Sequence, residues 1–126
     1  MGRVIDLPSI DATHRLGEYV ASKLTPNTIL ALFGPLGAGK TSFVQGLAKG
    51  LGISDSIQSP TFTYLHPYDG LYHFDLYRMK NAADFFSMGF EEYFDFGGIT
   101  AIEWAERLES FLPSRALCLR FSYEEM

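Results

Sequence analysis

The chain has 126 residues, with 10 Lys and Arg against 15 Asp and Glu, and its formal net charge is -5. This length suits one domain, residues 1–126, which can bury about two thirds of its unfolded surface. The acidic balance and the scattered basic residues argue against strong direct binding to nucleic acid. No run approaches the ~20 apolar residues that span a membrane, and the N-terminus lacks an apolar signal region, so we expect a cytoplasmic protein without membrane contact.

The first predicted elements precede a strand that begins at Thr28. Residues 3–7 suggest a short strand, and Ser9 can begin a helix that runs to about Leu24. Pro26 and Asn27 then break this helix. The helix residues expected to face the core are Leu16, Tyr19, Val20 and Leu24.

Residues 34–41 read G-P-L-G-A-G-K-T and directly follow an apolar run over residues 28–33. They match the phosphate-binding loop pattern G-x-x-x-x-G-K-[ST], whose glycines let backbone N–H groups point at phosphates. Lys40 is expected to reach the β and γ phosphates, and the Thr41 hydroxyl to bind Mg²⁺. The predicted nucleotide contacts in and beside this loop are Gly34, Pro35, Leu36, Gly37, Ala38, Gly39, Lys40, Thr41 and Ser42.

A helix is predicted directly after the loop, over residues 41–51, and Gly52 is placed to end it. The positive end of the helix dipole then adds to the attraction for phosphate. The alternative is a glycine-rich turn with a solvated lysine, which the preceding strand and the following helix disfavour. The apolar residues at helical spacing are Phe43, Val44, Leu47 and Leu51.

Two strands rich in β-branched and aromatic residues are predicted next, over residues 61–65 and 71–77. The segment H-P-Y-D-G between them, residues 66–70, is a predicted turn, and strands joined so closely must be antiparallel. A purely parallel sheet would need a crossover helix there. The predicted fold is therefore an α/β, phosphate-loop NTPase-like three-layer sandwich, with a mixed, mostly parallel sheet that contains an antiparallel hairpin.

The last third of the chain is predicted to alternate short helices and strands. Asn81 can cap a short helix through Met88, which Gly89 ends. After it we expect a helical turn over 91–94, a strand over 99–104, a helix over 105–111 and a strand over 115–121. Cys118 is the only cysteine, and its apolar surroundings in the sequence predict a buried strand thiol.

Hydrolysis needs more than a phosphate loop, because a carboxylate must hold Mg²⁺ or its water and another group must orient the attacking water. Glu103 ends the run G-I-T-A-I-E, as expected at the C-terminal edge of a buried strand. Asp75 could bind Mg²⁺ or orient water, the alternative being an ion pair with Arg78. The predicted catalytic residues are Lys40, Asp75 and Glu103, and the predicted metal ligands are Thr41, Glu103 and Asp75.

Three further residues leave two interpretations each. Thr61, in the segment S-P-T-F-T over residues 59–63, could sense the γ phosphate and its metal or be an ordinary strand residue. His73 shares a strand face with Asp75 and is favoured as a packed, hydrogen-bonded histidine over a general base. Trp104 is expected in the core, the alternative being a place near the nucleotide or a partner.

Aromatic residues are concentrated between positions 85 and 96. Most are expected in the core, and a protein-binding patch is the second interpretation because so small a domain cannot bury them all. The residues are Phe85, Phe86, Phe90, Tyr93, Phe94 and Phe96.

Five motifs occur in the order G-P-L-G-A-G-K-T, S-P-T-F-T, Y-H-F-D-L-Y-R, M-G-F-E-E-Y-F and I-E-W. Together they resemble the TsaE family of bacterial ATPases, also called YjeE, from the helix that contains Ala12 and Thr13 to the last strand. The resemblance implies a role in forming N6-threonylcarbamoyladenosine in tRNA, with ATP and Mg²⁺ as cofactors. It also implies the TsaD and TsaB proteins as partners, TsaD being the transferase, and ATP hydrolysis that resets their complex between rounds.

The resemblance also assigns roles to residues and shows two departures. Ala105 stands where family members usually have a proline after the tryptophan. The sequence ends at Met126, where the family typically continues into another strand, so we expect that C-terminal strand and tail to be absent. The implied roles are phosphate binding for residues 34–41, Mg²⁺ binding for Thr41 and Glu103, hydrolysis for Asp75 and a place near the base for Thr13.

Three functions compete on this sequence. The first is a partner-controlled ATPase of tRNA modification, and the second is a nucleotide-dependent binding module with the aromatic residues as its interface. The third is a small-molecule kinase, which would need an acceptor pocket and usually an arginine-rich lid. Arg107, Arg115 and Arg120 are scattered along the chain, which counts against the kinase.

Overall fold

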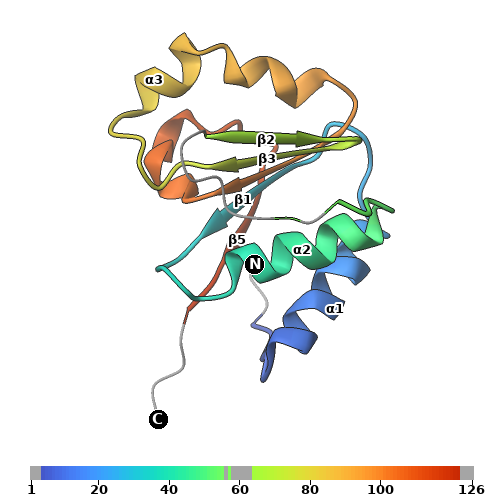
Figure 1. The fold of residues 1–126 in the computed structure, drawn as a ribbon. Coiled ribbons are helices and arrows are strands. Elements are labelled where there is room, and N and C mark those ends of the chain that lie inside the picture. Colours follow the sequence, from blue (N-terminus) through green and yellow to red (C-terminus); the bar gives the residue numbers. More distant parts are fainter. Residues whose placement is uncertain (1–3, 56, 58–63, 123–126) are drawn as a thin grey trace.

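The computed structural model describes residues 4–55, 57 and 64–122. Three helices and five strands form its framework, with three short 3-10 segments between them (Figure 1). The helices are α1 (Ile10–Ala21), α2 (Lys40–Gly50) and α3 (Ala82–Ser87), and the 3-10 segments are η1 (Phe90–Asp95), η2 (Ala105–Arg107) and η3 (Glu109–Phe111). The strands are β1 (Ile29–Phe33), β2 (Leu65–Tyr68), β3 (Leu71–Asp75), β4 (Ile99–Glu103) and β5 (Leu117–Arg120).

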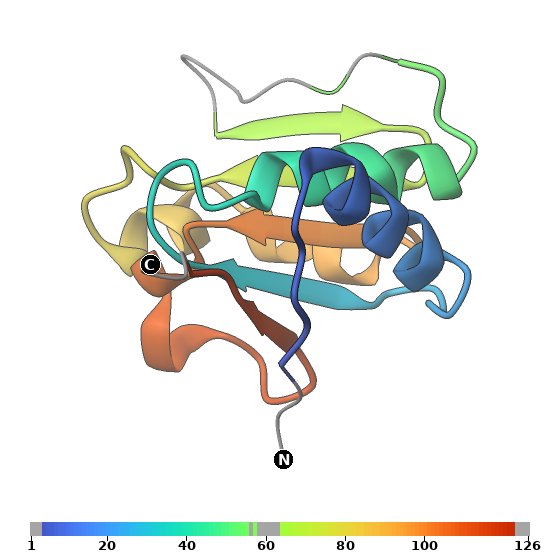
Figure 2. The ribbon, with the colours of Figure 1, turned by 90° about the horizontal axis from the view of Figure 1, so that it is seen from below.

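The five strands form one sheet in the order β2-β3-β4-β1-β5. Only the β2/β3 pair in this sheet is antiparallel, while β3/β4, β4/β1 and β1/β5 are parallel. Helices α1 and α2 cover one face, and α3 and η1 cover the other, as the two views of Figures 1 and 2 show. The predicted three-layer α/β sandwich with a mixed sheet and an antiparallel hairpin is confirmed.

The central strand β1 carries core residues on both faces. Leu30 and Leu32 belong to the apolar cluster under α1 and α2, whereas Ile29 and Ala31 belong to the cluster under α3. A strand flanked by parallel neighbours and covered on both faces reads as a continuous apolar run, which is why residues 28–33 were predictable as a strand. Its carboxyl end therefore emerges from a fixed, buried position.

Helices α1 and α2 pack closely because glycines lie between them. A Cβ built on Gly46 would lie 2.1 Å from the carbonyl oxygen of His14, and one on Gly17 would lie 2.4 Å from that of Phe43. Ser9 caps α1, since its hydroxyl accepts the N–H of Ala12 at 3.1 Å. The predicted start of this helix is confirmed, and the close approach of α1 brings it beside the first turn of α2.

Two expectations for the N-terminal part are wrong. Residues 4–7 form no strand, and Val4 is exposed, because β5 and not this segment pairs with the outer edge of β1. Tyr19 is 62% exposed instead of facing the core. Its ring lies beside the Lys23 ammonium group, on the solvent side of α1.

The hairpin is confirmed, but its first strand lies later in the chain than predicted. Strand β2 includes His66 and Pro67, and the turn is reduced to Asp69 and Gly70, whose φ of 89° suits glycine. Pro67 is tolerated because β2 is the edge strand, where a missing N–H need not break a ladder bond. The predicted strand residues 61–63 lie outside the described part of the chain.

The short helix α3 begins and ends as predicted. The Asn81 side chain accepts the N–H of Asp84 at 3.1 Å, and Gly89 follows the helix with φ 75°. The next turn, predicted over residues 91–94, is the slightly longer η1. No helix among the described residues combines the length and the apolar character that crossing a membrane requires.

The segment between β4 and β5 differs from the predicted helix over residues 105–111. It forms two 3-10 turns, η2 and η3, with Ala105 and Leu108 both buried. Their three-residue spacing fits the 3-10 repeat. The predicted last strand is present as β5, but the Cys118 thiol is exposed and the buried-thiol prediction is wrong. The reason is that β5 is an edge strand whose residues are mostly exposed.

Candidate functional site

The phosphate-loop motif forms a turn between β1 and α2. Gly34, Gly37 and Gly39 have φ values of 138°, 79° and 111°, which side-chain-bearing residues rarely adopt. At Gly34 a Cβ would also lie 2.4 Å from the carbonyl oxygen of Phe121, so the loop rests on the chain just after β5. Helix α2 starts at Lys40 and directs its first N–H groups toward the loop. This arrangement provides a cradle for an anion.

Lys40 lies inside the cradle and is only 4% exposed. Its Nζ donates to the carbonyl oxygens of Gly34 and Pro35, and it lies 3.8 Å from the centroid of the Trp104 ring. Burial lowers the pKa of Lys40, while the nearby carboxylates of Glu106, Glu103 and Asp75 oppose that shift. The ammonium group is thus held beside the loop in a poorly solvated place, where its attraction for phosphate is strongest.

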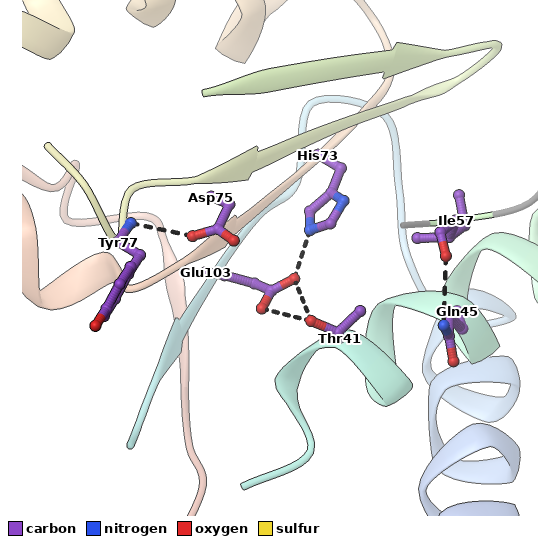
Figure 3. A network of polar contacts seen from close by, with 7 residues as sticks. All are labelled: Thr41, Gln45, Ile57, His73, Asp75, Tyr77 and Glu103. Atoms are coloured by element: carbon purple, nitrogen blue, oxygen red, sulfur yellow. Dashed lines mark hydrogen bonds and ion pairs between the residues drawn. The ribbon is translucent and has the colours of Figure 1, made fainter. Parts of the chain in front are cut away.

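Two carboxylates meet at the carboxyl edge of the sheet. Asp75 ends β3 and Glu103 ends β4, and the two are register partners in the parallel β3/β4 pair. Glu103 is 3% exposed, and the Thr41 hydroxyl donates to its carboxylate at 2.9 Å from Oε1 and 3.1 Å from Oε2 (Figure 3). His73 approaches the other side of the same carboxylate. The structure therefore brings together Thr41, Glu103 and Asp75, the three predicted metal ligands.

Asp75 is less buried than Glu103 and has a perturbed acidity. Burial raises the pKa of its carboxyl group, against the lowering effect of the Tyr77 N–H, which donates to Oδ1 at 3.0 Å. The Glu103 carboxylate raises this pKa further, and His73 and Lys40 lower it. No ion pair joins Asp75 to Arg78 among the described residues, so the alternative reading of Asp75 as an ion-pair partner is wrong.

The residues present fit a magnesium ion bound together with a nucleotide. Mg²⁺ prefers oxygen ligands and is usually held by one or two protein groups, substrate phosphates and water. The Thr41 hydroxyl and the Glu103 carboxylate supply such oxygens beside the cradle. Within the described ranges no group of three or more His, Cys, Asp or Glu residues could hold a metal ion by itself. An Mg²⁺ ion here would need phosphate oxygens as additional ligands.

The remaining predicted nucleotide contacts lie around the mouth of the loop. Pro35, Leu36 and Gly37 form its exposed tip, and Ser42 is half-buried in the first turn of α2. Thr13 is buried in α1, and its Cγ2 would lie 3.8 Å from a Cβ on Gly39. Its hydroxyl donates to the carbonyl oxygen of Ser9 at 3.2 Å, so its methyl group is the part nearest the loop. The predicted place of Thr13 near the base stays a prediction.

The predictions for Thr61 and for His73 have different outcomes. The predicted sensor Thr61 and the whole segment 59–63 lie outside the described residues, so that role stays a prediction. His73 is fully buried and hydrogen-bonded to Glu103, which is the packed histidine that the sequence favoured. It is not exposed to a substrate, as a general base would have to be.

The structure adds two residues to the neighbourhood of the loop. Trp104 adopts φ 59°, in the left-handed region, and is partly buried against the core, beside Lys40 and the Tyr77 ring. Its place near the nucleotide stays a prediction. The Glu106 carboxylate accepts the N–H of Gly34 at 2.9 Å, which anchors the start of the loop to η2. Sequence reasoning missed Glu106 because η2 was expected to be an α-helix, in which its direction would differ.

Sequence comparison relates this fold and site to a known family. A family model described as threonylcarbamoyl adenosine biosynthesis protein TsaE matches residues 7–126, nearly the whole chain. The chain belongs to the TsaE family. The expected resemblance is thereby confirmed, including its extent along the chain.

Several members of the TsaE family are similar to this chain over most of its length. A tRNA threonylcarbamoyladenosine biosynthesis protein TsaE from Treponema pallidum is 47% identical over 108 residues, which cover 83% of this chain and 80% of the relative. The protein of the same name from Synechocystis is 50% identical over 117 residues, covering 86% and 73%. This TsaE-family chain also matches the crystal structure of Bacillus subtilis YdiB, with a TM-score of 0.78 and 34% identity over 94% of this chain and 74% of that one.

Proposed function

We propose that this protein is a Mg²⁺-dependent ATPase of tRNA threonylcarbamoyladenosine biosynthesis. The observation that carries the proposal is the contact between the Thr41 hydroxyl and the Glu103 carboxylate, beside a glycine loop that encloses Lys40. A phosphate cradle alone would bind nucleotide, but hydrolysis also requires a carboxylate, such as the one at the end of the neighbouring strand. The family of the chain supplies the biosynthetic context.

The proposed roles follow from where each side chain lies. The loop amides of residues 34–41 and the Lys40 ammonium group bind the phosphates of ATP, with Ser42 at the start of α2 and Thr61 as further contacts. Thr41 and Glu103 hold Mg²⁺, which supplies charge stabilisation when bound. Asp75, beside Glu103 and less buried, orients the attacking water or binds a water of the metal. Thr13 contributes to the pocket of the base.

The proposed partners are proteins, not tRNA itself. The net charge of -5 argues against direct contact with a phosphate backbone, and the family resemblance implies TsaD and TsaB. Exposed apolar side chains on the α3 side, Met88, Phe96 and Phe111, suit a protein contact better than a nucleic-acid contact. We propose that the protein acts in the cytoplasm, where tRNA modification takes place.

The test is Mg-ATP hydrolysis by this chain alone and after addition of purified TsaB and TsaD. The Lys40→Ala variant is the blank, because it removes the ammonium group from the cradle. We expect weak turnover alone and a rise of tenfold or more with the partners, which corresponds to about 1.4 kcal/mol of barrier. No hydrolysis in either condition, with nucleotide still bound, would contradict the ATPase and favour the nucleotide-dependent binding module.

The contacts of three arginines in this protein argue against the small-molecule kinase. Arg107 donates to the carbonyl oxygen of Tyr77 at 2.9 Å, and Arg115 pairs with Asp95 at 3.1 Å. Arg120 lies over the Phe33 ring, 4.6 Å from its centroid. These three arginines already have contacts within the fold, which counts against their forming the lid that a kinase needs.

A further inference from the structure

A fully buried histidine lies behind the carboxylate of Glu103. The side chain of His73 is 0% exposed, and its Nε2 lies 2.6 Å from Oε2 of Glu103. Figure 3 shows the carboxylate held between this ring on one side and Thr41 on the other. Among the described residues, His73 has no hydrogen bond or ion pair with the loop, so its polar effect on the site passes through Glu103.

The register of the sheet explains how the ring reaches Glu103. His73 is the partner of Ala101 in the β3/β4 pair, and Asp75 is the partner of Glu103. His73 and Glu103 therefore lie diagonally across two neighbouring strands on the same face, a spacing that long side chains can bridge. The small side chain of Ala101 leaves room for the imidazole between them.

The hydrogen bonds define which atom of His73 acts. A carboxylate only accepts, so Thr41 Oγ1 and His73 Nε2 are both donors to Glu103. The other ring nitrogen, Nδ1, is buried and has no hydrogen-bond partner among the described residues, which suits an unprotonated nitrogen better than an N–H. Among the described residues, the hydrogen bond to Glu103 is thus the one hydrogen bond of this buried ring.

We propose that His73 is a positioning residue that fixes the Glu103 carboxylate in the orientation from which it and Thr41 hold Mg²⁺. This inference rests on the proposed function, because it assigns the ion to Thr41 and Glu103. Partners behind a metal-binding group fix its direction, and losing one typically costs about 10–100-fold in metal affinity or activity. His73 acts on the metal step and not on the phosphate loop.

Two variants of His73 and one of His66 test this inference. His73→Leu removes the donor, and His73→Gln keeps an N–H donor near the place of Nε2. His66→Leu is the matched control, because His66 lies directly opposite His73 on β2 and is one strand further from Glu103. Circular dichroism and thermal unfolding select the variants that fold.

The first measurement is calorimetric binding of ADP with and without Mg²⁺, which needs no turnover. We expect His73→Leu to weaken the Mg²⁺-dependent gain in affinity about tenfold or more, with metal-free ADP binding within about twofold of the native protein. His73→Gln should recover most of the loss, and His66→Leu should behave like the native protein. Equal weakening of metal-free and Mg²⁺-ADP binding, or an unchanged Mg²⁺ dependence, would overturn the inference.

The second measurement uses the native protein and applies even if His73→Leu does not fold. Imidazole ¹⁵N spectra should show His73 protonated at Nε2 and not at Nδ1, with a shift on addition of Mg-ADP that is larger than the shift with ADP alone. A His73 signal that does not respond to Mg²⁺, or that carries its proton on Nδ1, would contradict the inference. Absence of ATP hydrolysis in the native protein would instead contradict the ATPase proposal. It would not decide the inference on His73, which the two measurements above test without turnover.

Discussion

A buried lysine and several carboxylates lie close together beside the phosphate loop. Lys40 is buried among three carboxylates, while Asp75 and Glu103 lie next to each other at the ends of parallel strands. Two neighbouring carboxylates repel, and burial adds a desolvation cost to the ionised form of Asp75. This arrangement favours binding of a cation between the carboxylates and the phosphates. It also lowers the free energy of unfolding, which a substitution can reveal.

At the residue scale, Asp75→Asn should lose activity and gain stability. We expect turnover to fall about 100-fold or more, the range that a positioned acid or base contributes, while nucleotide binding is kept. The folded-state pKa of Asp75 lies above its usual value, so its ionisation costs stability. That cost appears as the pH rises above the ordinary carboxyl range and is complete above the raised pKa.

The measurement is the unfolding midpoint of Asp75→Asn and the native protein across pH. The variant cannot ionise and still offers an oxygen to the Tyr77 N–H, so it should be the more stable protein at neutral pH. The difference should vanish below the ordinary carboxyl range, where the native Asp75 is protonated in both states. A variant that is less stable at neutral pH would show that Asp75 is ionised and stabilised in the fold.

At the scale of elements, the pairing of α1 with α2 determines what surrounds the loop. Glycine contacts bring the two helices together, and His14 Nε2 lies 2.9 Å from Oε1 of Gln45 across them. Gln45 in turn donates to the carbonyl oxygen of Ile57 at 3.3 Å, on the chain that leads toward residues 59–63 (Figure 3). The second turn of α2 is therefore held from two sides.

Gly46→Ala should destabilise the fold although alanine is the better helix former. The new methyl group would lie 2.1 Å from the His14 carbonyl oxygen, so the helices must separate. We expect a loss of about 1–3 kcal/mol in the free energy of unfolding, measured with urea. Lys49→Ala on the same helix is the control, because its ion pair with Glu18 is exposed and worth under about 1 kcal/mol. Equal stability of Gly46→Ala and the native protein would mean that the helices can separate freely.

Because β5 is an edge strand, we expect the thiol of Cys118 to be reactive. Its exposed thiol should react with one equivalent of a thiol reagent in the native protein, without denaturant. Addition of Mg-ADP should leave the rate unchanged, because Cys118 pairs with Ala31 on β1, three residues before the loop begins at Gly34. Reaction only after unfolding would show that the thiol is covered in solution.

At the scale of the whole molecule, the site lies where the sheet order makes it accessible. Strand β1 lies between β4 and β5, both parallel to it, so three carboxyl ends meet at one edge. In open α/β sheets ligands bind at such an edge, outside the carboxyl ends of the strands. The loop after β1 and the carboxylates after β3 and β4 share this edge, although 62 residues separate Thr41 from Glu103 in the chain.

Binding at this edge should stabilise the whole fold. A ligand that binds only the folded chain adds about 2.7 kcal/mol at a hundredfold excess over its dissociation constant. We expect Mg-ADP to raise the melting temperature of the native protein, and Lys40→Ala to lose most of that rise. An equal rise in both proteins would show that the nucleotide binds elsewhere, and the comparison is made by differential scanning fluorimetry at matched protein concentration.

The predictable parts of this protein are those whose physical cause is local in sequence. The glycine pattern of residues 34–41, the cap at Ser9 and the apolar run into β1 each act within a few residues, and each was placed correctly. Glu103 was found because an acid that ends a buried strand is visible in the sequence, and Asp75 because it is an acid within a predicted strand rich in aromatic residues. The sequence by itself therefore determined the family, the order of the main elements and most of the candidate site.

Only the tertiary structure decided features that depend on neighbours distant in the chain. Pro67 can lie in β2, and Cys118 can be exposed, because both belong to edge strands, and strand order is not a local property. The diagonal contact of His73 with Glu103 depends on the register of β3 against β4, which a shift of one residue would abolish. Pairing and packing across the sheet determined these positions, because their energies arise between segments and not within them.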